Sequence, residues 1–295
     1  MILEKHVNHY AQASRVDSLV AERDVVLTYV LKALAEQEDS LLRHLALKGG
    51  SCMKKLYFGK SGRFSMDLDF TSLDIGPKKV ASELHSLLDQ RERHGISFVI
   101  EEEWSRENSY GALLGYSHAW NSSKFQIEVS FREHPILSVA ESLLLDELYF
   151  RYCEFEPFKV RCLQKEEILA EKIRASFQRL RARDLYDLYL FATKPRSYDT
   201  NKARTLTVLK CWNSRDPFEP KTLLDKISGE RYDWSDLQRL VRQNALPSNK
   251  TLVRTVVRHY AYLKDLDRDL QRVVADSKAH RQASLVKKLA SQLRC

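Results

Sequence analysis

The sequence lacks long apolar runs, a disulfide pattern and low-complexity tracts. No apolar stretch approaches the roughly 20 residues that a membrane-spanning helix needs. The N-terminus lacks the basic start, apolar core and small-residue cleavage site of a signal peptide. The five cysteines form no C-x-x-C pair, which argues against a disulfide framework and a zinc site. We therefore expect a protein without membrane association in a reducing cytoplasm.

Positive charge is concentrated in the last third of the chain. The 295 residues are 43% hydrophobic and 30% charged, which is typical of a globular protein with two modest domains. From residue 201 onward there are 20 Lys and Arg against 10 Asp and Glu, whereas residues 1–200 hold 28 against 30. A basic patch suits a nucleic-acid partner, and a helical domain that is simply basic would look the same.

Hydrophobic periodicity predicts an α/β (α+β) fold with a mixed sheet and flanking helices. We expect this sheet domain over residues 1–160 and a mainly helical, basic domain over 161–295 that completes the site and binds RNA. The sheet domain should hold helices and strands, with a hairpin turn at Asn121–Ser123. The helices are expected at 15–44 and 137–149, and the strands at 66–70, 97–102, 111–119, 124–131 and 158–163. One or two helices are expected at about 250–293.

Two aspartates in the sequence Asp67-Leu68-Asp69-Phe70 are candidate metal ligands. Residues two apart in a strand share a face, so both carboxylates should point the same way. Mg²⁺ is usually held by one or two carboxylates together with substrate phosphates. Two such ions can activate an attacking hydroxyl and stabilise the leaving pyrophosphate. An Asp-rich turn or a solvated strand face would give the same pattern.

Gly49, Gly50 and Ser51 precede a helical pattern and form a candidate phosphate site. The free N–H groups at a helix start attract phosphate, and glycine lets the backbone come close to it. Ser51 is then expected as the N-cap of this helix. An ordinary turn with a serine cap remains the alternative. The order of glycine turn, short helix and D-x-D is more specific than either motif alone.

A third carboxylate is expected on the strand at 124–131, which alternates apolar and polar residues. Glu128 lies on the polar side of this strand, beside Gln126 and Ser130. It would serve as a metal ligand or as the general base on an incoming hydroxyl. A solvent-facing strand residue is an equally good interpretation of the pattern.

A second cluster lies between residues 165 and 191. Lys172 and Arg179 are seven residues apart, so they are expected on one helix face, two turns apart. Asp184 and Asp187 open a second helix, where Asp184 would be an N-cap and Asp187 a first-turn acid. Ordinary surface charges explain this segment, taken alone, equally well.

The motifs KGGSCMKKLYF, RFSMDLDF and EKIRASFQRLRARDLYDLY, in this order, resemble the AbiEii/AbiGii toxin family over roughly residues 22–192. These are nucleotidyltransferase-like toxins of type IV toxin–antitoxin and phage-defence systems, and the MenT toxins look similar. Where the family often has G-G-T-A, this chain has Gly49-Gly50-Ser51-Cys52, which keeps the hydroxyl. We assign no role to the Cys52 thiol.

The resemblance implies a role for each matching residue. Gly50 and Ser51 would bind phosphate, together with Gly49 beside them. Asp67 and Asp69 would form the metal-binding pair. Lys172 would contact the phosphates of the nucleotide, and Asp184 matches a later essential aspartate. Asp187 matches less well.

The function implied is transfer of a nucleotide from a nucleoside triphosphate, with Mg²⁺ or Mn²⁺, to an RNA acceptor. The resemblance implies the 3′ end of tRNA as acceptor, which would block translation and growth, and a cognate antitoxin encoded nearby. No apolar repeat suggests a dimer seam, so a monomer is expected. A small-molecule or protein nucleotidyltransferase is the first alternative. Reversing the charges of Arg254, Arg258 and Arg268 should abolish the activity of an RNA-modifying enzyme but not that of a small-molecule enzyme. A non-catalytic RNA-binding protein is the second.

Overall fold

The computed structural model describes residues 2–36, 40–194, 198–229 and 231–294. The chain divides into two compact units. The first, which we call the sheet unit, comprises Met1–Pro135, Val139–Leu163 and Arg239–Gln243. The second, the helical unit, comprises Ile136–Ser138, Gln164–Gln238 and Asn244–Cys295. In the described ranges no helix is long and apolar enough to cross a membrane.

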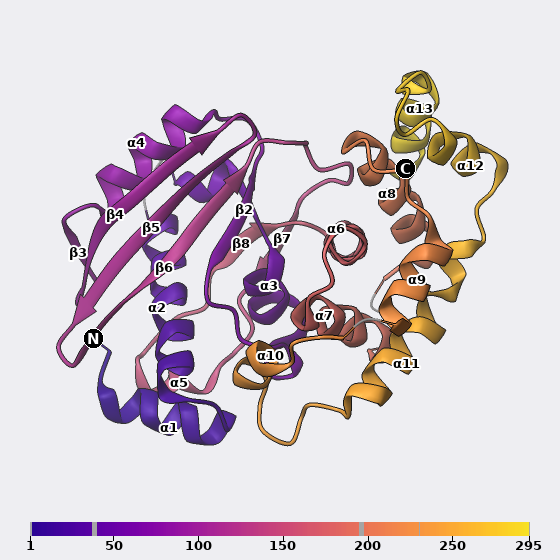
Figure 1. Cartoon of the computed structure of the whole chain (residues 1–295). Helices are drawn as coiled ribbons and strands as arrows, with labels where there is room; N and C mark the ends of the chain where they lie inside the picture. The colour runs from indigo at the N-terminus through magenta and orange to yellow at the C-terminus, as the bar shows by residue number, and fades with distance from the viewer. Residues whose placement is uncertain (1, 37–39, 195–197, 230, 295) are drawn as a thin grey trace. The chain divides into compact units, whose positions relative to one another are not determined.

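An eight-stranded mixed sheet forms the centre of the sheet unit (Figure 1). Its strand order is β3-β4-β5-β6-β2-β1-β8-β7. The pairs β2–β6 and β1–β8 are parallel, and the other neighbours are antiparallel. The expected α/β fold with a mixed sheet is therefore confirmed. The strands are β1 (Leu45–Lys48), β2 (Leu68–Ser72), β3 (Arg91–Arg93), β4 (Ile96–Arg106), β5 (Ser109–His118), β6 (Asn121–Ser130), β7 (Ala140–Leu143) and β8 (Lys159–Cys162).

One face of the sheet is covered by helices α2 (Ser18–Ala35) and α4 (Pro77–Leu88), which lie behind it in Figure 1. Alternate residues of β6 are buried on this face, namely Phe125, Ile127 and Val129. The intervening Gln126 and Glu128 are exposed, so they belong to the opposite, open face. The polar side of β6 therefore points away from the core.

One expected turn and one expected helix of this unit differ from the structure. The β5–β6 hairpin turns at Ala119–Trp120, because Asn121 already pairs with His118 and its side chain donates to Glu22 on α2. Residues 137–149 are not a helix: they contain β7, and the short helix α5 (Leu148–Tyr152) follows. β7 pairs with β8 some twenty residues further on, and such non-local pairing overrides local helical spacing.

The sheet unit also contains two α-helices at its N-terminus and several short helical segments. The expected helix over 15–44 is confirmed only in part: α2 begins after the N-cap Asp17, whose side chain accepts from the Leu19 N–H, and it ends at Ala35. Residues 37–39 of that expectation lie outside the described residues. The other elements are α1 (Glu4–Ser14), η1 (Leu41–Arg43), α3 (Gly49–Cys52), the π-helical segment η2 (Met53–Phe58) and η3 (Gly59–Ser61).

The helical unit is built around the pair α6 and α8. Their contact includes a buried ion pair, with Lys210 Nζ 2.8 Å from Glu167 Oε1. The region 250–293 forms three α-helices rather than the expected one or two, because a 3₁₀ segment and two loops interrupt it. The helices are α6 (Lys165–Gln178), α7 (Ala182–Thr193), α8 (Thr200–Asn213), α9 (Pro220–Gly229), α10 (Ser235–Leu240), α11 (Asn249–His259), η4 (Tyr260–Lys264), α12 (Arg268–Ala275) and α13 (Ala283–Arg294).

Candidate active site

The glycine turn joins β1 directly to the helix α3. Gly49 has φ +68°, a left-handed conformation that favours glycine. A Cβ atom on Gly49 would lie 2.4 Å from Oδ2 of Asp69, and one on Gly50 would lie 2.9 Å from a guanidinium nitrogen of Arg63. The turn thus fits between a carboxylate and a guanidinium with no room for a side chain. This close approach is to side chains of the protein, and the predicted approach of phosphate to the glycines stays a prediction.

Ser51 is not the N-cap of this helix. Lys48 occupies the N-cap position and makes no side-chain cap hydrogen bond. Ser51 is buried inside the first turn, and its Oγ donates to the backbone carbonyl of Asp67 at 2.6 Å. Ser65 Oγ donates to the same carbonyl at 3.4 Å. The Ser51 hydroxyl therefore ties the glycine turn to the acidic segment, and its contact with phosphate stays a prediction.

The acidic residues predicted for the site lie on or beside the neighbouring strands β2 and β6. Asp69 on β2 is paired with Lys48 on β1 and with Glu128 on β6. Residues paired directly across strands share a face, so Lys48, Asp69 and Glu128 form one row, which we call the charged row. Asp67 lies just before β2, and its Oδ1 accepts the backbone N–H of Gln126 at 3.1 Å. The structure thus makes Asp69 and Glu128 neighbours across the sheet, with Asp69 against the glycine turn and Asp67 two residues before it.

An aromatic residue extends this row. Glu128 pairs with Gly111 on β5, and Gly111 pairs with Trp104 on β4. A Cβ atom on Gly111 would lie 2.3 Å from the Trp104 ring, so the indole lies across the glycine, next to the carboxylates. Trp104 lies two residues beyond the strand that the sequence predicted at 97–102 and was not among the predicted site residues. A glycine inside a strand of apolar residues was the available signal, because such a glycine marks a close approach.

The residues present suit a magnesium ion held jointly with a substrate. In the described part of the chain, no group of three or more His, Cys, Asp and Glu side chains is arranged to hold a metal. Asp67 accepts the Gln126 N–H through Oδ1, while Asp69 lies against the glycine turn where phosphate would approach. One or two carboxylates completed by phosphate oxygens is the donor set that Mg²⁺ commonly uses. Glu128 as a third ligand stays a prediction.

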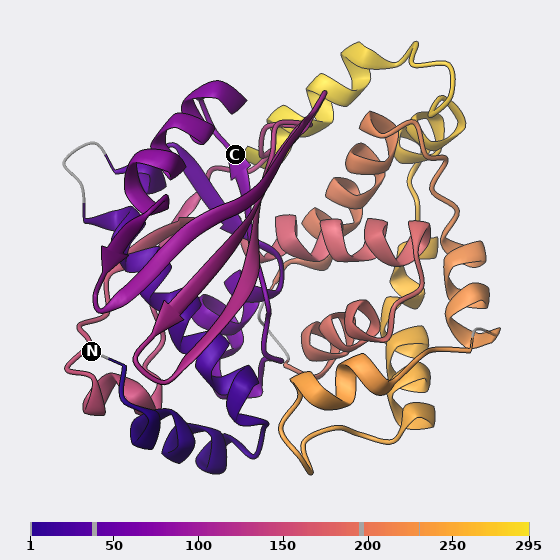
Figure 2. The same cartoon turned by 60° about the vertical axis from the view of Figure 1, so that its left-hand side comes forward.

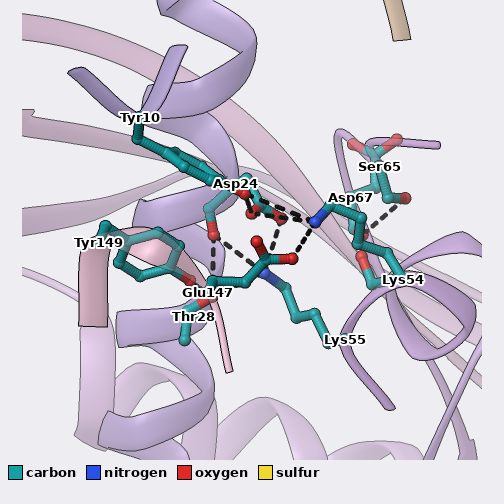
Figure 3. Close-up of polar contacts among 10 residues, drawn as sticks. Tyr10, Asp24, Thr28, Lys54, Lys55, Ser65, Asp67, Glu147 and Tyr149 are labelled. Carbon is teal, nitrogen blue, oxygen red and sulfur yellow. Dashed lines mark hydrogen bonds and ion pairs between the residues drawn. The ribbon is translucent and has the colours of Figure 1, made fainter. Parts of the chain in front are cut away.

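A buried ionic cluster supports the segment that follows the glycine turn (Figure 3). The Lys54 ammonium lies between Glu147, its hydrogen-bond partner, and Asp24 Oδ2 at 4.0 Å. Lys55 Nζ donates to Asp24 Oδ1 at 2.8 Å and to Thr28 Oγ1 at 2.6 Å. Burial opposes ionisation of Asp24, yet the attraction of Lys55 and Lys54 lowers its pKa below the ordinary value.

This cluster was not foreseen from the sequence, since two adjacent lysines normally indicate a solvated surface. Here the π-helical segment η2 turns both side chains into the core, where they are only 1% and 5% exposed. Tyr10 also reaches Asp24, to which its hydroxyl donates at 2.8 Å. The cluster anchors η2, and therefore the end of the glycine turn, to α1 and α2.

The helical unit carries the second set of candidate residues. Lys172 on α6 places Nζ 2.7 Å from Asp187 Oδ2 and 3.3 Å from Asp184 Oδ1. All three are buried, so the two aspartates fix the position of the ammonium. Arg179 Nε lies 3.2 Å from Asp184 Oδ2. Asp187, the less certain match, is the nearer partner of Lys172.

Three local expectations for this segment were wrong. Asp187 lies in the second turn of its helix and not in the first. α6 ends at Gln178 and Arg179 is extended, so Arg179 does not continue the helix face of Lys172. It still reaches the same aspartate because the chain turns back towards α7. Asp184 is not the N-cap of α7: Arg181 holds that position, and Asp184 lies in the first turn, where an acid complements the helix dipole.

Comparison with known proteins places the chain in a family. Residues 32–289 match the model of the nucleotidyl transferase AbiEii toxin of type IV toxin–antitoxin systems. MenT4, a nucleotidyltransferase toxin of Mycobacterium tuberculosis H37Rv, shares the fold with a TM-score of 0.84 at 24% identity, over 100% of both chains. JHP933 from Helicobacter pylori matches with a TM-score of 0.51 at 16% identity, covering 90% of this chain and 98% of its own. Curated proteins gave no match. This chain therefore belongs to the AbiEii nucleotidyl transferase toxin family of type IV toxin–antitoxin systems.

Proposed function

We propose that this chain is a cytoplasmic, metal-dependent nucleotidyltransferase that transfers a nucleotide from a nucleoside triphosphate to the 3′ end of tRNA. The observation that carries the proposal is the charged row of Lys48, Asp69 and Glu128, which borders the glycine turn at Gly49. It combines backbone donors for phosphate with carboxylates for a divalent cation. Membership of a nucleotidyl transferase family supports the same chemistry.

The chain's own residues would hold the triphosphate. The N–H groups at the start of α3 lack helical acceptors and attract anionic oxygens, and Lys48 adds positive charge beside them. Asp67 and Asp69 would hold Mg²⁺ or Mn²⁺, which when bound neutralises the phosphates and the developing charge. Lys172 would contact the nucleotide's phosphates, with Asp184 and Asp187 as positioning residues that hold its ammonium.

In the proposed reaction the terminal hydroxyl of the acceptor attacks the α-phosphorus. Its proton passes to a carboxylate, for which Glu128 is the candidate, while the bond from the α-phosphorus to the bridging oxygen breaks and pyrophosphate leaves. A tRNA extended at its 3′ end cannot be aminoacylated, so translation and growth would stop. The type IV family description supports a cognate antitoxin as partner.

A transfer assay tests this proposal. Purified protein is incubated with total tRNA, Mg²⁺ and each nucleoside triphosphate labelled at the α-phosphate. Label should enter tRNA with at least one nucleotide and should be absent with Asp69→Ala. A fully active Asp69→Ala protein would refute the mechanism. Label that enters a protein or a small molecule but no RNA would favour the alternative nucleotidyltransferases of the same fold.

A further inference from the structure

Helices α9 and α11 of the helical unit lie side by side (Figures 1 and 2), and a cavity of about 770 Å³ opens over them. None of the carboxylates or lysines assigned above to the reaction lines this cavity. Its lining combines exposed cations, two aromatic rings and two valines. These side chains are exposed or half-buried, so they are not part of the core of the unit. The lining residues are Ser228, Arg231, Tyr232, Trp234, Asn249, Lys250, Val253, Arg254, Val257 and Arg258.

α11 presents two parallel rows of side chains to this cavity. Residues four apart lie on one helix face, separated by about 6 Å along the axis. Lys250, Arg254 and Arg258 follow this spacing and are exposed. Val253 and Val257 form the neighbouring row and are half-buried. The helix therefore offers an apolar floor bordered by a straight line of positive charge.

The aromatic side chains add flat surfaces to the cavity. Tyr232 and Trp234 are half-buried, and their ring centroids lie 5.3 Å apart with the planes inclined at 51°. Every nucleobase has a flat face that can stack on such a ring, and stacking of this kind tolerates any sequence. Rings beside cations are the arrangement by which proteins bind unpaired nucleotides.

The residues that line the cavity carry positive charge and include no acidic side chain. Its lining contains Arg231, Lys250, Arg254 and Arg258 and no carboxylate. In the ranges that the structure describes, none of these four side chains forms an ion pair. Two other exposed cations of the unit, Lys288 and Arg272, do have a carboxylate partner, which is Asp269 at 3.6 and 3.7 Å. The cavity is therefore complementary to a polyanion.

We propose that this cavity binds an unpaired stretch of the RNA acceptor. A base stacks on Trp234 and Tyr232 over the valine floor, and successive phosphates pair with Lys250, Arg254 and Arg258. The inference rests on the proposed function and names the part of the chain that receives its RNA. Cations spread along about two helical turns suit the successive phosphates of a strand better than the clustered phosphates of one triphosphate.

The cavity is fixed to the helix that carries the aspartates of the second cluster. α11 packs against α7, and its Leu252 and Val256 are buried. Just after α11, the hydroxyl of buried Tyr260 donates to the carbonyl of Leu188 on α7 at 3.0 Å. RNA held in the cavity is thereby held on the same rigid pair of helices as Asp184 and Asp187.

Fluorescence anisotropy with a labelled oligouridylate tests the proposal. Trp234→Ala should weaken binding about tenfold or more, as removal of one stacking ring does, and Trp234→Phe should restore most of it. The triple variant Lys250→Ala, Arg254→Ala, Arg258→Ala should reduce the slope of log affinity against log salt by about 2, at about 0.7 for each lost phosphate contact. The matched control removes three exposed lysines outside the cavity, Lys264, Lys278 and Lys287, and should leave the slope nearly unchanged.

The outcomes separate this inference from the proposed function. Asp69→Ala should lose transfer but bind the oligouridylate like the wild type. Cavity variants that bind RNA like the wild type would overturn the inference while the function stands, and would leave an acidic protein as the occupant. Displacement of the oligouridylate by ATP at equal phosphate concentration would also overturn it. Loss of RNA binding in these variants, in a protein that labels no RNA, would support the cavity and refute the function.

Discussion

Asp69 and Gly49 fit together so closely that a single methyl group on Gly49 would lie 2.4 Å from the Asp69 carboxylate. The contact joins two motifs that are twenty residues apart in the sequence. It also places the carboxylate where a phosphate bound at the start of α3 would meet it. The first prediction tests this contact.

Gly49→Ala should abolish most of the transfer activity while the protein remains folded. The left-handed φ of +68° costs an L-residue about 1–2 kcal/mol, and the added methyl group must displace Asp69 as well. Transfer rates and thermal unfolding together measure the two effects. Gly76→Ala is the matched control, because nothing lies within 4 Å of a Cβ atom there. Normal transfer by Gly49→Ala would show that Asp69 has room to move without consequence.

Removal of the divalent cation should stop transfer, and Glu128→Gln should show whether Glu128 helps to hold it. Because Glu128 neighbours Asp69 in the charged row, loss of its charge should raise the Mg²⁺ concentration needed for half-maximal transfer. A titration of rate against Mg²⁺ measures this. Glu107→Gln, an exposed acid at the β4–β5 turn, is the control. A lower maximal rate at an unchanged Mg²⁺ requirement would instead identify Glu128 as the general base.

Lys172→Met should destabilise the protein by about 3–5 kcal/mol, because it leaves two buried carboxylates without their shared cation. Urea unfolding measures the loss, and adding Asp187→Asn should recover part of it. Lys210→Met is the matched control, since Lys210 forms an equally buried pair with Glu167 outside the candidate site. Both variants should lose stability, but only Lys172→Met should lose transfer per folded molecule. Equal transfer losses would reduce Lys172 to a structural role.

Asp24→Asn should lower the free energy of unfolding by about 3–5 kcal/mol at pH 7, because Lys55 then lies buried without its carboxylate partner. The pKa of Asp24 is lowered in the folded state, so its contribution is present above the unfolded pKa of about 3.9. It is lost as the pH falls through the lower, folded pKa. Urea unfolding of both proteins should therefore show a difference that shrinks in acid. A constant difference from pH 7 to the acid limit would contradict the ion pair.

Local patterns in the sequence predicted the individual strands of the site better than they predicted which strands lie side by side. The strand around Asp69 and the alternating strand of Glu128 follow from side-chain periodicity, which acts within a few residues. Their adjacency does not, because the register of β2 with β6 depends on the whole sheet. The same is true of β7, whose pairing with β8 replaced an expected helix.

The burial of Lys54 and Lys55 could not be predicted from the sequence either. It depends on Asp24 and Glu147, which lie about thirty residues before and ninety residues after the two lysines in the sequence. In contrast, Lys172, Asp184 and Asp187 were singled out together because they lie on two consecutive helices, although their contacts were not predicted. The details of Ser51 and Arg179 differ from expectation since a cap position or a helix end is decided by single hydrogen bonds.

The parallel pairing of β2 with β6 has a consequence for the order of events during synthesis. Asp69 reaches Glu128 only after the hairpin strands β4, β5 and β6 have been made, and such long-range strand pairing forms late because a large loop must close first. A chain still emerging from the ribosome therefore holds its acidic residues apart. The two carboxylates therefore cannot meet before nearly half of the chain has been translated.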